Sequence, residues 1–374
     1  MKIGIDIRHL CSINQSGVGY YTINLIKALA NIAQDDEFIL FATGSKRRCS
    51  LLPSFPEKNV RIVARHIPNK LITLALKAPG KKTLESFLNE DIDYWLFPNI
   101  NTIKTNLPYA ITLHDMSFQL FPHFFTFKQR LWHKNANVQK LINKASVVFT
   151  VSNKTKKDAL RYTKIHSNRI QVTPLGVNSS FTAKTQPSDK NYLRHYNINF
   201  PYLLTLSTLE PRKNIESVIE AFDRIQDQKT HLIIAGGSGW KTTTISQALI
   251  KTRHRNRIHL IGYVSNKHKA ALMRNAAAFI FPSYYEGFGL PILESMACGT
   301  PVITSFTSSM PEVAGNAGIL IDPFNTQDIQ QAINSITQDP KLSSLLSQRG
   351  IERASDFTWS ATAQKTLKRI KNMS

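Results

Sequence analysis

Apolar and polar positions along the chain form two blocks, each built from short apolar runs that alternate with helical patterns. In the first block, seven apolar runs predict β-strands at residues 2–7, 38–43, 60–65, 94–99, 109–115, 146–152 and 169–177. Helical periodicity between these runs predicts helices at residues 20–33, 83–89, 128–144 and 154–162. Residues 181–200 are polar and interrupt the pattern, which indicates a domain boundary in that stretch.

The second block repeats this organisation. Six apolar runs predict strands at residues 202–208, 231–237, 257–262, 277–283, 300–305 and 318–323. Helices are expected at residues 215–225, 267–275, 291–297, 326–336 and 341–354. Strands that alternate with helices predict an α/β fold with two doubly wound, mostly parallel sheets. We therefore expect domains at residues 1–185 and 200–355, followed by a terminal segment at residues 356–374.

Length and composition narrow the class of protein. A chain of 374 residues fits two domains of ordinary size. No apolar run approaches the roughly 20 residues that a membrane-spanning helix needs, and the charged residues near the start indicate a strand rather than a signal peptide. The three cysteines have no paired spacing, which argues against a disulfide framework or a zinc site and favours a reducing cytoplasm.

The net charge of +22 is concentrated in the first half of the chain. Residues 1–184 hold 26 Lys and Arg against 11 Asp and Glu, a net charge of +15, and the remaining residues carry +7. Such a surface suits nucleic acid, an anionic membrane or an anionic substrate, whereas a proteome-wide excess of basic residues gives the same count without any function. The pattern at residues 128–144 fits a helix at a membrane interface, although a helix with its apolar side on the core is the commoner case.

Two carboxylates, Glu286 and Glu294, frame the sequence EGFGLPILE. Glu286 lies on a Gly-rich turn after an apolar run, and Glu294 lies inside a helix expected to begin near Leu290. Carboxylates accept hydrogen bonds from pairs of sugar or ribose hydroxyls, so we predict that the two groups hold opposite ends of one ligand. Because Glu294 has apolar neighbours, it should be partly buried, and a buried charge needs partners. The alternative to a ligand role is a Glu inside the helix that pairs with a neighbouring cation.

Two further segments have the chemistry of a phosphate site. Arg212 and Lys213 follow the first strand of the second block and precede a helix, and two cations at a helix N-terminus favour a pyrophosphate. Gly17 and Gly19 lie in a loop between the first strand and the first helix, where the backbone of glycine approaches a ligand closely. The loop lacks the third glycine of a dinucleotide fingerprint, so a nicotinamide site is not expected.

The string EGFGLPILESMACGTPVI, from Glu286 to Ile303, resembles the C-terminal signature of retaining glycosyltransferases that use nucleotide sugars and have the GT-B fold. This family includes bacterial mannosyl- and glucosyltransferases, and Ser295 stands where the family usually has Ala. The sequence Glu210-Pro-Arg-Lys-Asn also fits the family. The resemblance implies two Rossmann-like domains that face a central cleft, with a C-terminal helix that crosses back to the first domain.

The resemblance also implies roles for individual residues. Arg212 and Lys213 would neutralise the leaving diphosphate, and Glu286 would face the hydroxyls of the donor sugar. His114, at the end of a strand in the first block, would contact the transferred sugar, and Glu294 would accept the ribose hydroxyls. The other residues expected to contact the nucleotide sugar are Gly17, Gly19, Tyr263, Phe288, Gly289 and Leu290.

The implied reaction transfers a hexose with retention of configuration, with mannose from GDP-mannose as the favoured donor and UDP-glucose or UDP-N-acetylglucosamine left open. The acceptor would be lipid-linked or a growing polysaccharide in the synthesis of a cell-surface glycan such as lipopolysaccharide O-antigen. We expect no cofactor and no essential metal, because the chain has no Asp-x-Asp motif and its cations can meet the phosphate charge. The alternatives are a sugar-nucleotide epimerase or a phosphorylase with the same fold, or a basic nucleic-acid-binding protein. The last lacks the aromatic and basic motifs of RNA modules, so no nucleic-acid partner is expected.

Overall fold

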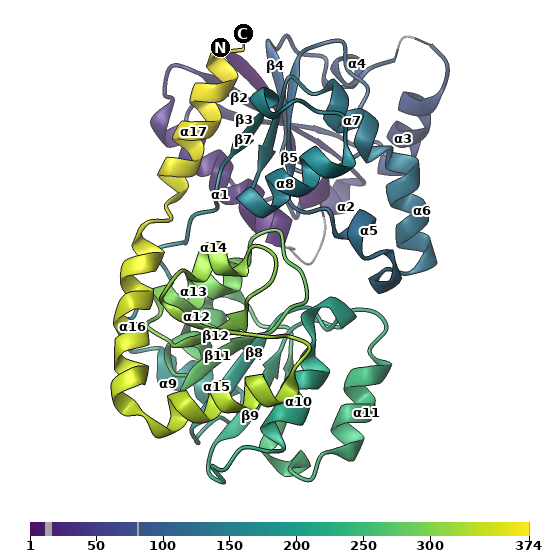
Figure 1. Cartoon of the computed structure of the whole chain (residues 1–374). Helices are drawn as coiled ribbons and strands as arrows, with labels where there is room; N and C mark the ends of the chain where they lie inside the picture. The colour runs from purple at the N-terminus through teal and green to yellow at the C-terminus, as the bar shows by residue number, and fades with distance from the viewer. Residues whose placement is uncertain (12–16, 81, 374) are drawn as a thin grey trace. The chain divides into compact units, whose positions relative to one another are not determined.

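The computed structural model describes residues 1–11, 17–80 and 82–373 (Figure 1). These residues form two compact units. The first unit consists of Met1–Leu120, Phe127–Gly176 and Thr358–Ser374, and the second consists of Phe121–Thr126 and Val177–Phe357. The units therefore divide after Gly176, ahead of the polar stretch, and a short segment from the first half of the chain groups with the second unit.

The first unit contains a seven-stranded parallel sheet with the order β3-β2-β1-β4-β5-β6-β7. All seven strands predicted for the first block are present. The inner strands consist largely of completely buried aromatic and β-branched residues such as Trp95 and Ile111, as expected for strands covered on both faces, whereas the edge strand β3 exposes Ile62. The strands are β1 (Lys2–Asp6), β2 (Glu37–Thr43), β3 (Val60–Arg65), β4 (Tyr94–Phe97), β5 (Tyr109–Leu113), β6 (Val147–Thr150) and β7 (Ile170–Val172).

The second unit contains a six-stranded parallel sheet with the order β10-β9-β8-β11-β12-β13. All six strands predicted for the second block are present, and the expectation of two Rossmann-like α/β domains is confirmed. The strands are β8 (Tyr202–Leu206), β9 (His231–Ala235), β10 (Ile258–Gly262), β11 (Ala278–Phe281), β12 (Val302–Ser305) and β13 (Gly318–Ile321).

The helices of the first unit correct one prediction. Residues 128–144 form two helices rather than one, because Asn137 adopts a left-handed conformation (φ 48°) and its side chain accepts a hydrogen bond from the N–H of Lys140, which caps the second helix. The helices are α1 (Gly17–Ile32), α2 (Lys46–Cys49), α3 (Asn69–Lys77), α4 (Leu84–Leu88), α5 (Ser117–Leu120), α6 (Phe127–Ala136), α7 (Val138–Lys144), α8 (Asn153–Tyr162) and α17 (Trp359–Lys371).

In the second unit, three helices lie where the sequence pattern did not predict them: α9, α11 and α14. The reason is clearest for α9, whose only buried residue is Asp189, which pairs with Arg274 of α12 (2.8 Å). A helix held by an ion pair leaves no apolar periodicity in the sequence. The helices are α9 (Asp189–His195), α10 (Ile215–Phe222), α11 (Thr243–Lys251), α12 (Asn266–Arg274), α13 (Leu290–Ala297), α14 (Met310–Ala314), α15 (Thr326–Gln338) and α16 (Pro340–Ser355).

The C-terminal helix α17 belongs to the first unit, as the family resemblance implied, and packs along α1 (Figure 1). The ring of Trp359 lies 5.8 Å from that of Tyr21 on α1. A side chain at Gly176 would place its Cβ 2.2 Å from the backbone nitrogen of Trp359, so the close approach of these two segments requires glycine.

Each sheet has a point where the strand order reverses. This point lies between β1 and β4 in the first unit and between β8 and β11 in the second. In open α/β sheets, ligands bind outside the carboxyl ends of the strands at such a point. Among the described helices, none combines the length and the apolar character that a bilayer crossing requires.

Candidate functional site

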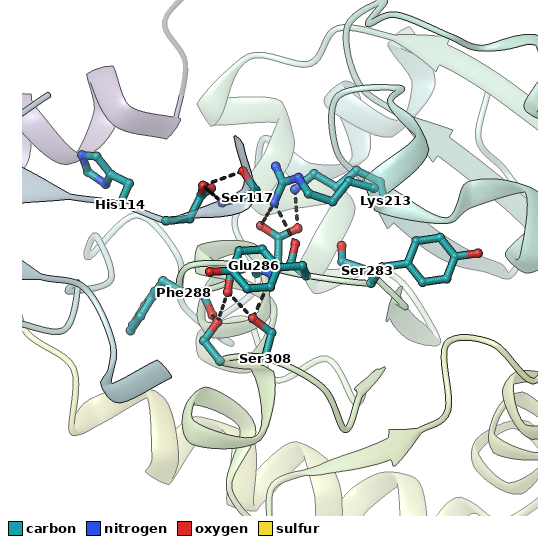
Figure 2. A network of polar contacts seen from close by, with 12 residues as sticks. His114, Ser117, Lys213, Ser283, Glu286, Phe288 and Ser308 are labelled. Atoms are coloured by element: carbon teal, nitrogen blue, oxygen red, sulfur yellow. Dashed lines mark hydrogen bonds and ion pairs between the residues drawn. The ribbon is translucent and has the colours of Figure 1, made fainter. Parts of the chain in front are cut away.

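Arg212, Lys213 and Glu286 meet at the reversal point of the second sheet. Arg212 and Lys213 lie on the 3-10 turn η4 (Pro211–Lys213) after β8, and Glu286 follows the neighbouring strand β11. Arg212 Nη1 lies 2.8 Å from Glu286 Oε2, and Lys213 Nζ lies 2.6 Å from Glu286 Oε1. Figure 2 shows the carboxylate of Glu286 pointing at Lys213, so each of its oxygens faces one cation.

Glu210 completes this group, and its role was not predicted. Its carboxylate lies 2.7 Å from Arg212 Nη2, and its side chain is buried. Arg212 also donates to the backbone carbonyl of Tyr285 (2.8 Å). Two cations and two carboxylates therefore balance in charge, and we call these four residues, Glu210, Arg212, Lys213 and Glu286, the cation–carboxylate cluster.

Burial and mutual attraction set the ionisation of this cluster. Burial alone would raise the pKa of the Glu286 carboxyl, but Arg212 and Lys213 outweigh it and lower that pKa to about 2. Burial, followed by the repulsion from Arg212, lowers the pKa of Lys213. The two cations therefore repel each other in a site with little water, and an anion placed between them relieves that repulsion.

Backbone contacts fix the turn that carries Glu286. Ser308 Oγ donates to the carbonyl of Glu286 (2.6 Å) and accepts from its N–H (3.2 Å), and Ser309 Oγ lies 2.9 Å from the carbonyls of both Glu286 and Phe288. Figure 2 shows Ser308 beneath the turn that joins Glu286 to Phe288. These serines follow β12, so a third strand supports the position of the carboxylate.

Asn214 joins the loops after three strands. It has a left-handed backbone (φ 56°), is completely buried, and donates to the carbonyls of Pro282 (3.2 Å) and Pro323 (2.7 Å). The hydroxyl of Tyr284 donates to its side-chain oxygen (2.8 Å). This satisfied network holds η4 against the end of β11, which keeps Arg212 and Lys213 facing Glu286.

Glu294 lies within α13 and is 1% exposed. It forms an ion pair with Lys269 of α12, so the predicted burial is confirmed and the carboxylate has the neighbouring cation that the alternative to a ligand role predicted. The ammonium of Lys269 also lies 5.4 Å from the ring of Phe181. Lys269 lies against one oxygen of this carboxylate, Oε2.

The start of α13 has the backbone geometry that the sequence indicated. Gly289 precedes Leu290 with φ 102°, and a Cβ there would lie 2.9 Å from Ile292 Cδ1. The positive φ favours glycine, whereas the contact is with the end of the Ile292 side chain, which can shift. Phe288 is buried against Phe357, with ring centroids 6.0 Å apart. The N-terminus of α13 is thus held beside Glu286.

In the first unit, His114 follows β5, and its Nε2 lies 2.8 Å from the carbonyl of Pro98, the residue after β4. Burial lowers the pKa of His114, so the ring is neutral. Because a carbonyl only accepts hydrogen bonds, Nε2 carries the hydrogen and Nδ1 is the acceptor nitrogen. The ring lies edge-on to Tyr21, with centroids 4.8 Å apart.

His9 lies close to this group and was not singled out from the sequence. It belongs to the 3-10 turn η1 (Arg8–Leu10) after β1, and its Nε2 lies 2.9 Å from Thr22 Oγ1 on α1. Burial lowers the pKa of His9 to about 4, so it too is neutral. Two neutral histidines therefore lie near the reversal point of the first sheet.

Gly17 and Gly19 were predicted to lie in a loop. They lie instead in the first turn of α1, which begins at Gly17. Ser16, the first residue of the expected loop, lies outside the described residues. A Cβ at Gly17 would meet no atom within 4 Å, so packing does not require glycine there. The backbone N–H groups at this helix N-terminus still favour an anion.

Tyr263 is not brought to the cation–carboxylate cluster. It follows β10 and is 58% exposed. Because β10 lies three strands from β11 in the sheet, the two strand ends are roughly 14 Å apart. A ligand that contacts both Tyr263 and Glu286 must span that distance, which is the length of a nucleotide sugar rather than of a monosaccharide.

Within the described part of the chain, no group of three or more His, Cys, Asp or Glu side chains is arranged to hold a metal ion. Positive charge at the cluster comes from Arg212 and Lys213.

Comparisons with known proteins agree on one class of enzyme. Residues 193–353 match the family of glycosyl transferases group 1, and residues 15–181 match glycosyltransferase family 4. The O-antigen chain mannosyltransferase B of Escherichia coli is 27% identical over 370 residues, which cover 95% of this chain and 96% of the relative.

Two solved structures share the whole fold. The sucrose-phosphate synthase of Thermosynechococcus elongatus superposes with a TM-score of 0.77 at 19% identity and covers 100% of this chain and 98% of its own. Anabaena HepE, solved in complex with UDP-glucose, superposes with a TM-score of 0.76 at 19% identity and covers 100% of both chains.

Proposed function

Because this chain belongs to the glycosyltransferases, with a group 1 domain at residues 193–353 and a family 4 domain at residues 15–181, we propose that it transfers mannose from GDP-mannose with retention of configuration. The proposed acceptor is lipid-linked or a growing polysaccharide in the synthesis of a cell-surface glycan. Support for the sugar comes from the full-length resemblance to the O-antigen chain mannosyltransferase B. Support for the chemistry comes from the cation–carboxylate cluster at the reversal point of the second sheet.

Arg212 and Lys213 are proposed to stabilise the leaving diphosphate. Negative charge grows on that group as the bond to the sugar breaks, and fixed cations in a site with little water stabilise this charge more than they stabilise the ground state. A diphosphate would take over hydrogen bonds that Arg212 and Lys213 now make with Glu286. The carboxylate of Glu286 would then accept hydrogen bonds from the hydroxyls of the donor sugar.

Glu286 is not suited to act as a general acid or as a nucleophile. A carboxyl with a pKa of about 2 stays ionised at neutral pH and has no proton to give. Both of its oxygens already face cations, which reduces their nucleophilicity. We therefore favour transfer on one face of the sugar: the bond from the anomeric carbon to the phosphate oxygen breaks, the acceptor oxygen bonds to the same face, and the acceptor proton passes to the leaving phosphate.

The remaining residues are assigned as follows in this proposal. Nδ1 of His114 accepts a hydrogen bond from a hydroxyl of the transferred sugar, and Glu294 accepts the ribose hydroxyls. Tyr263 lies far enough from Glu286 to contact the base. Gly17, Gly19, Phe288, Gly289 and Leu290 offer backbone N–H groups at two helix N-termini to the diphosphate or the sugar.

The test is a donor screen. The purified chain is incubated separately with radiolabelled GDP-mannose, UDP-glucose and UDP-N-acetylglucosamine, with and without a lipid-linked glycan acceptor. The proposal expects acceptor-dependent transfer from GDP-mannose and an anomeric configuration, read by NMR, equal to that of the donor. Transfer from a UDP-sugar alone overturns the proposed donor. Conversion of the donor without acceptor indicates an epimerase, and an inverted product overturns retention.

We also propose that transfer needs no essential metal ion, since Arg212 and Lys213 supply positive charge where the diphosphate would lie. Transfer is therefore expected to persist after treatment with EDTA. Complete loss of transfer that Mg²⁺ restores would overturn this part of the proposal.

A further inference from the structure

The positive charge of the first half of the chain is confined to two stretches. Residues 58–84 and 116–157 together hold fifteen Lys and Arg and no Asp or Glu. The rest of residues 1–184 holds equal numbers of basic and acidic residues and is neutral overall. Part of this charge is paired with acidic residues outside the stretches, Arg61 with Glu90 and Lys154 with Asp158, so the relevant surfaces are identified from the exposed residues of the helices. Helix α3 lies in the first stretch and α6 in the second.

Helix α6 is oriented with its apolar side outward. None of its residues is buried, and its inner side consists of Gln129, His133 and Ala136. The ring of His133 stacks on that of Phe118 at 4.5 Å. On the opposite side, Phe127 is 73% exposed and Leu131, one turn later, is also exposed. A helix that packs on a core shows the reverse pattern. The core-facing arrangement is therefore wrong for α6 but is confirmed for α7, in which Val138, Leu141 and Ile142 are buried.

Helix α3 exposes apolar residues in a similar way. Its inner residues, Ile72 and Leu76, are buried in the core of the first unit, whereas Leu71 and Leu74 point outward, the latter 68% exposed. Ala136 of α6 packs against the same core. Figure 1 draws the two helices along one side of the first unit. We call the outward residues of these helices the α3–α6 surface.

Basic residues border the exposed apolar residues of both helices. In α6 these are Lys128, Arg130 and Lys134, and in α3 they are Lys70 and Lys77, all exposed and with no acidic residue in either helix. Trp132 is a further exposed aromatic residue of α6. Apolar residues with Trp or Phe among them and Lys or Arg beside them are the composition of helices that lie in the interface of a bilayer.

We propose that the α3–α6 surface binds the anionic surface of a lipid bilayer. The apolar side chains would enter the boundary between headgroups and acyl chains, and the lysines and arginines would reach the anionic headgroups. The inference rests on the proposed function in one respect only: a lipid-linked acceptor would then be presented at the surface on which the enzyme lies.

The apolar residues favour a bilayer over a nucleic acid as the partner. The phosphate backbone of a nucleic acid would attract the basic residues, but it has no apolar region in which Leu74, Phe127 and Leu131 could become buried. A group of strongly exposed apolar side chains indicates an interaction site. Binding of nucleic acid is therefore an outcome that the test must distinguish.

The experiment is co-sedimentation of the full chain with vesicles, without donor or acceptor. Vesicles of phosphatidylcholine mixed with phosphatidylglycerol are compared with vesicles of phosphatidylcholine alone. Binding is expected only to the mixed vesicles and should weaken with added salt. The double variant Phe127→Gln and Leu131→Gln, and the triple variant Lys128→Gln, Arg130→Gln and Lys134→Gln, are each expected to bind at least about tenfold more weakly.

Matched controls lie on the second unit. Ile250→Gln removes an apolar side chain that is 83% exposed on α11, and Lys229→Gln, Lys267→Gln and Lys341→Gln together remove three exposed charges. Equal loss of binding in these controls, or binding to double-stranded DNA but not to the mixed vesicles, overturns the proposal. Transfer to a detergent-dispersed acceptor is measured for every variant. It should be unchanged when only vesicle binding is lost, so a failure of the proposed transfer reaction is recognised separately.

Discussion

The two carboxylates at the ends of one signature segment have different surroundings. Both are buried, and each pairs with a lysine whose ammonium lies over a phenylalanine ring: Lys213 over Phe281 at 5.1 Å and Lys269 over Phe181 at 5.4 Å. Glu286, however, also pairs with Arg212, which in turn pairs with Glu210. Glu294 has Lys269 alone as an ion-pair partner among the described residues.

This difference indicates that the Glu286 end stabilises negative charge on a bound group, whereas the Glu294 end binds hydroxyl groups of the ligand. The four charges of the cation–carboxylate cluster balance, but its two cations repel each other and both face Glu286. A diphosphate that replaces Glu286 as their partner keeps both cations paired, so the Glu286 end is equipped for a leaving diphosphate. Among the described residues, the Glu294 end has Lys269 as its one ion-pair partner, so it offers an incoming anion no second cation, but its carboxylate keeps further lone pairs for hydroxyls. The Glu294 end is therefore expected to affect donor binding rather than turnover.

The largest expected effect distinguishes the two lysines. Lys213→Ala should lower kcat by about 10²-fold or more, as the loss of one preorganised electrostatic group does. Arg212→Ala should do the same. Lys269→Ala should change kcat by less than about tenfold, since its charge is proposed to face the ribose end and not the leaving group. Steady-state kinetics with GDP-mannose measure all three variants.

Lys269→Ala is a suitable control because the two lysine side chains are almost equally exposed, at 12% and 14%. Near-normal kcat in Lys213→Ala would refute the assigned role of the cation–carboxylate cluster. An equal fall in both lysine variants would refute the separation between the two ends.

Glu286→Gln and Glu294→Gln extend the comparison to stability. Glu286→Gln leaves Arg212 and Lys213 buried with one carboxylate between them, and removing one partner from a buried ion pair costs about 3–5 kcal/mol. Glu294→Gln should cost less, because a single lysine can turn toward water. Denaturant unfolding of both variants measures the difference, and an equal or larger loss in Glu294→Gln would contradict it.

Much of the Glu286 end was predictable from the sequence, because each of its parts directly follows an apolar run. Arg212 and Lys213 follow β8, and Glu286 follows β11. The sequence does not contain the strand order, which places these two strands side by side. For that reason the ion pairs between the cations and Glu286 were not predicted, and neither were the supporting contacts of Ser308 and Ser309.

The partner of Glu294 was unpredictable for a different reason. Lys269 lies on α12, and it reaches Glu294 because α12 packs against α13. No local sequence pattern encodes the packing of two helices against each other. The orientation of α6 is similar: the spacing of Phe127 and Leu131 predicts an apolar side, but only the fold determines whether that side faces the core or the solvent.

The pKa of Glu286 gives the comparison a pH dependence. Its pKa falls from 4.5 to about 2 on folding, so its stabilising contribution is complete above pH 4.5 and is lost as the pH falls toward 2. The Tm of the native chain should therefore approach that of Glu286→Gln as the pH is lowered from about 6 to about 3. A difference in Tm that stays constant over this range would show that the ionised form of Glu286 contributes nothing to stability.

The smallest expected effect tests whether the negative charge of Glu210 lowers the affinity of Arg212 and Lys213 for a diphosphate. Glu210→Gln removes one of two carboxylates and gives the cation–carboxylate cluster a net positive charge, while Arg212 keeps its contacts with Glu286 and the carbonyl of Tyr285. GDP should then bind at least about fivefold more tightly, since even an exposed charge pair contributes up to about 1 kcal/mol and this pair is buried, and kcat should fall if product release limits turnover. A residue that only supports the fold would weaken GDP binding when replaced. A higher inhibition constant for GDP in Glu210→Gln would therefore show that Glu210 positions Arg212 and does not lower the affinity of the cluster for anions. In that case Arg212 and Lys213 alone would set that affinity.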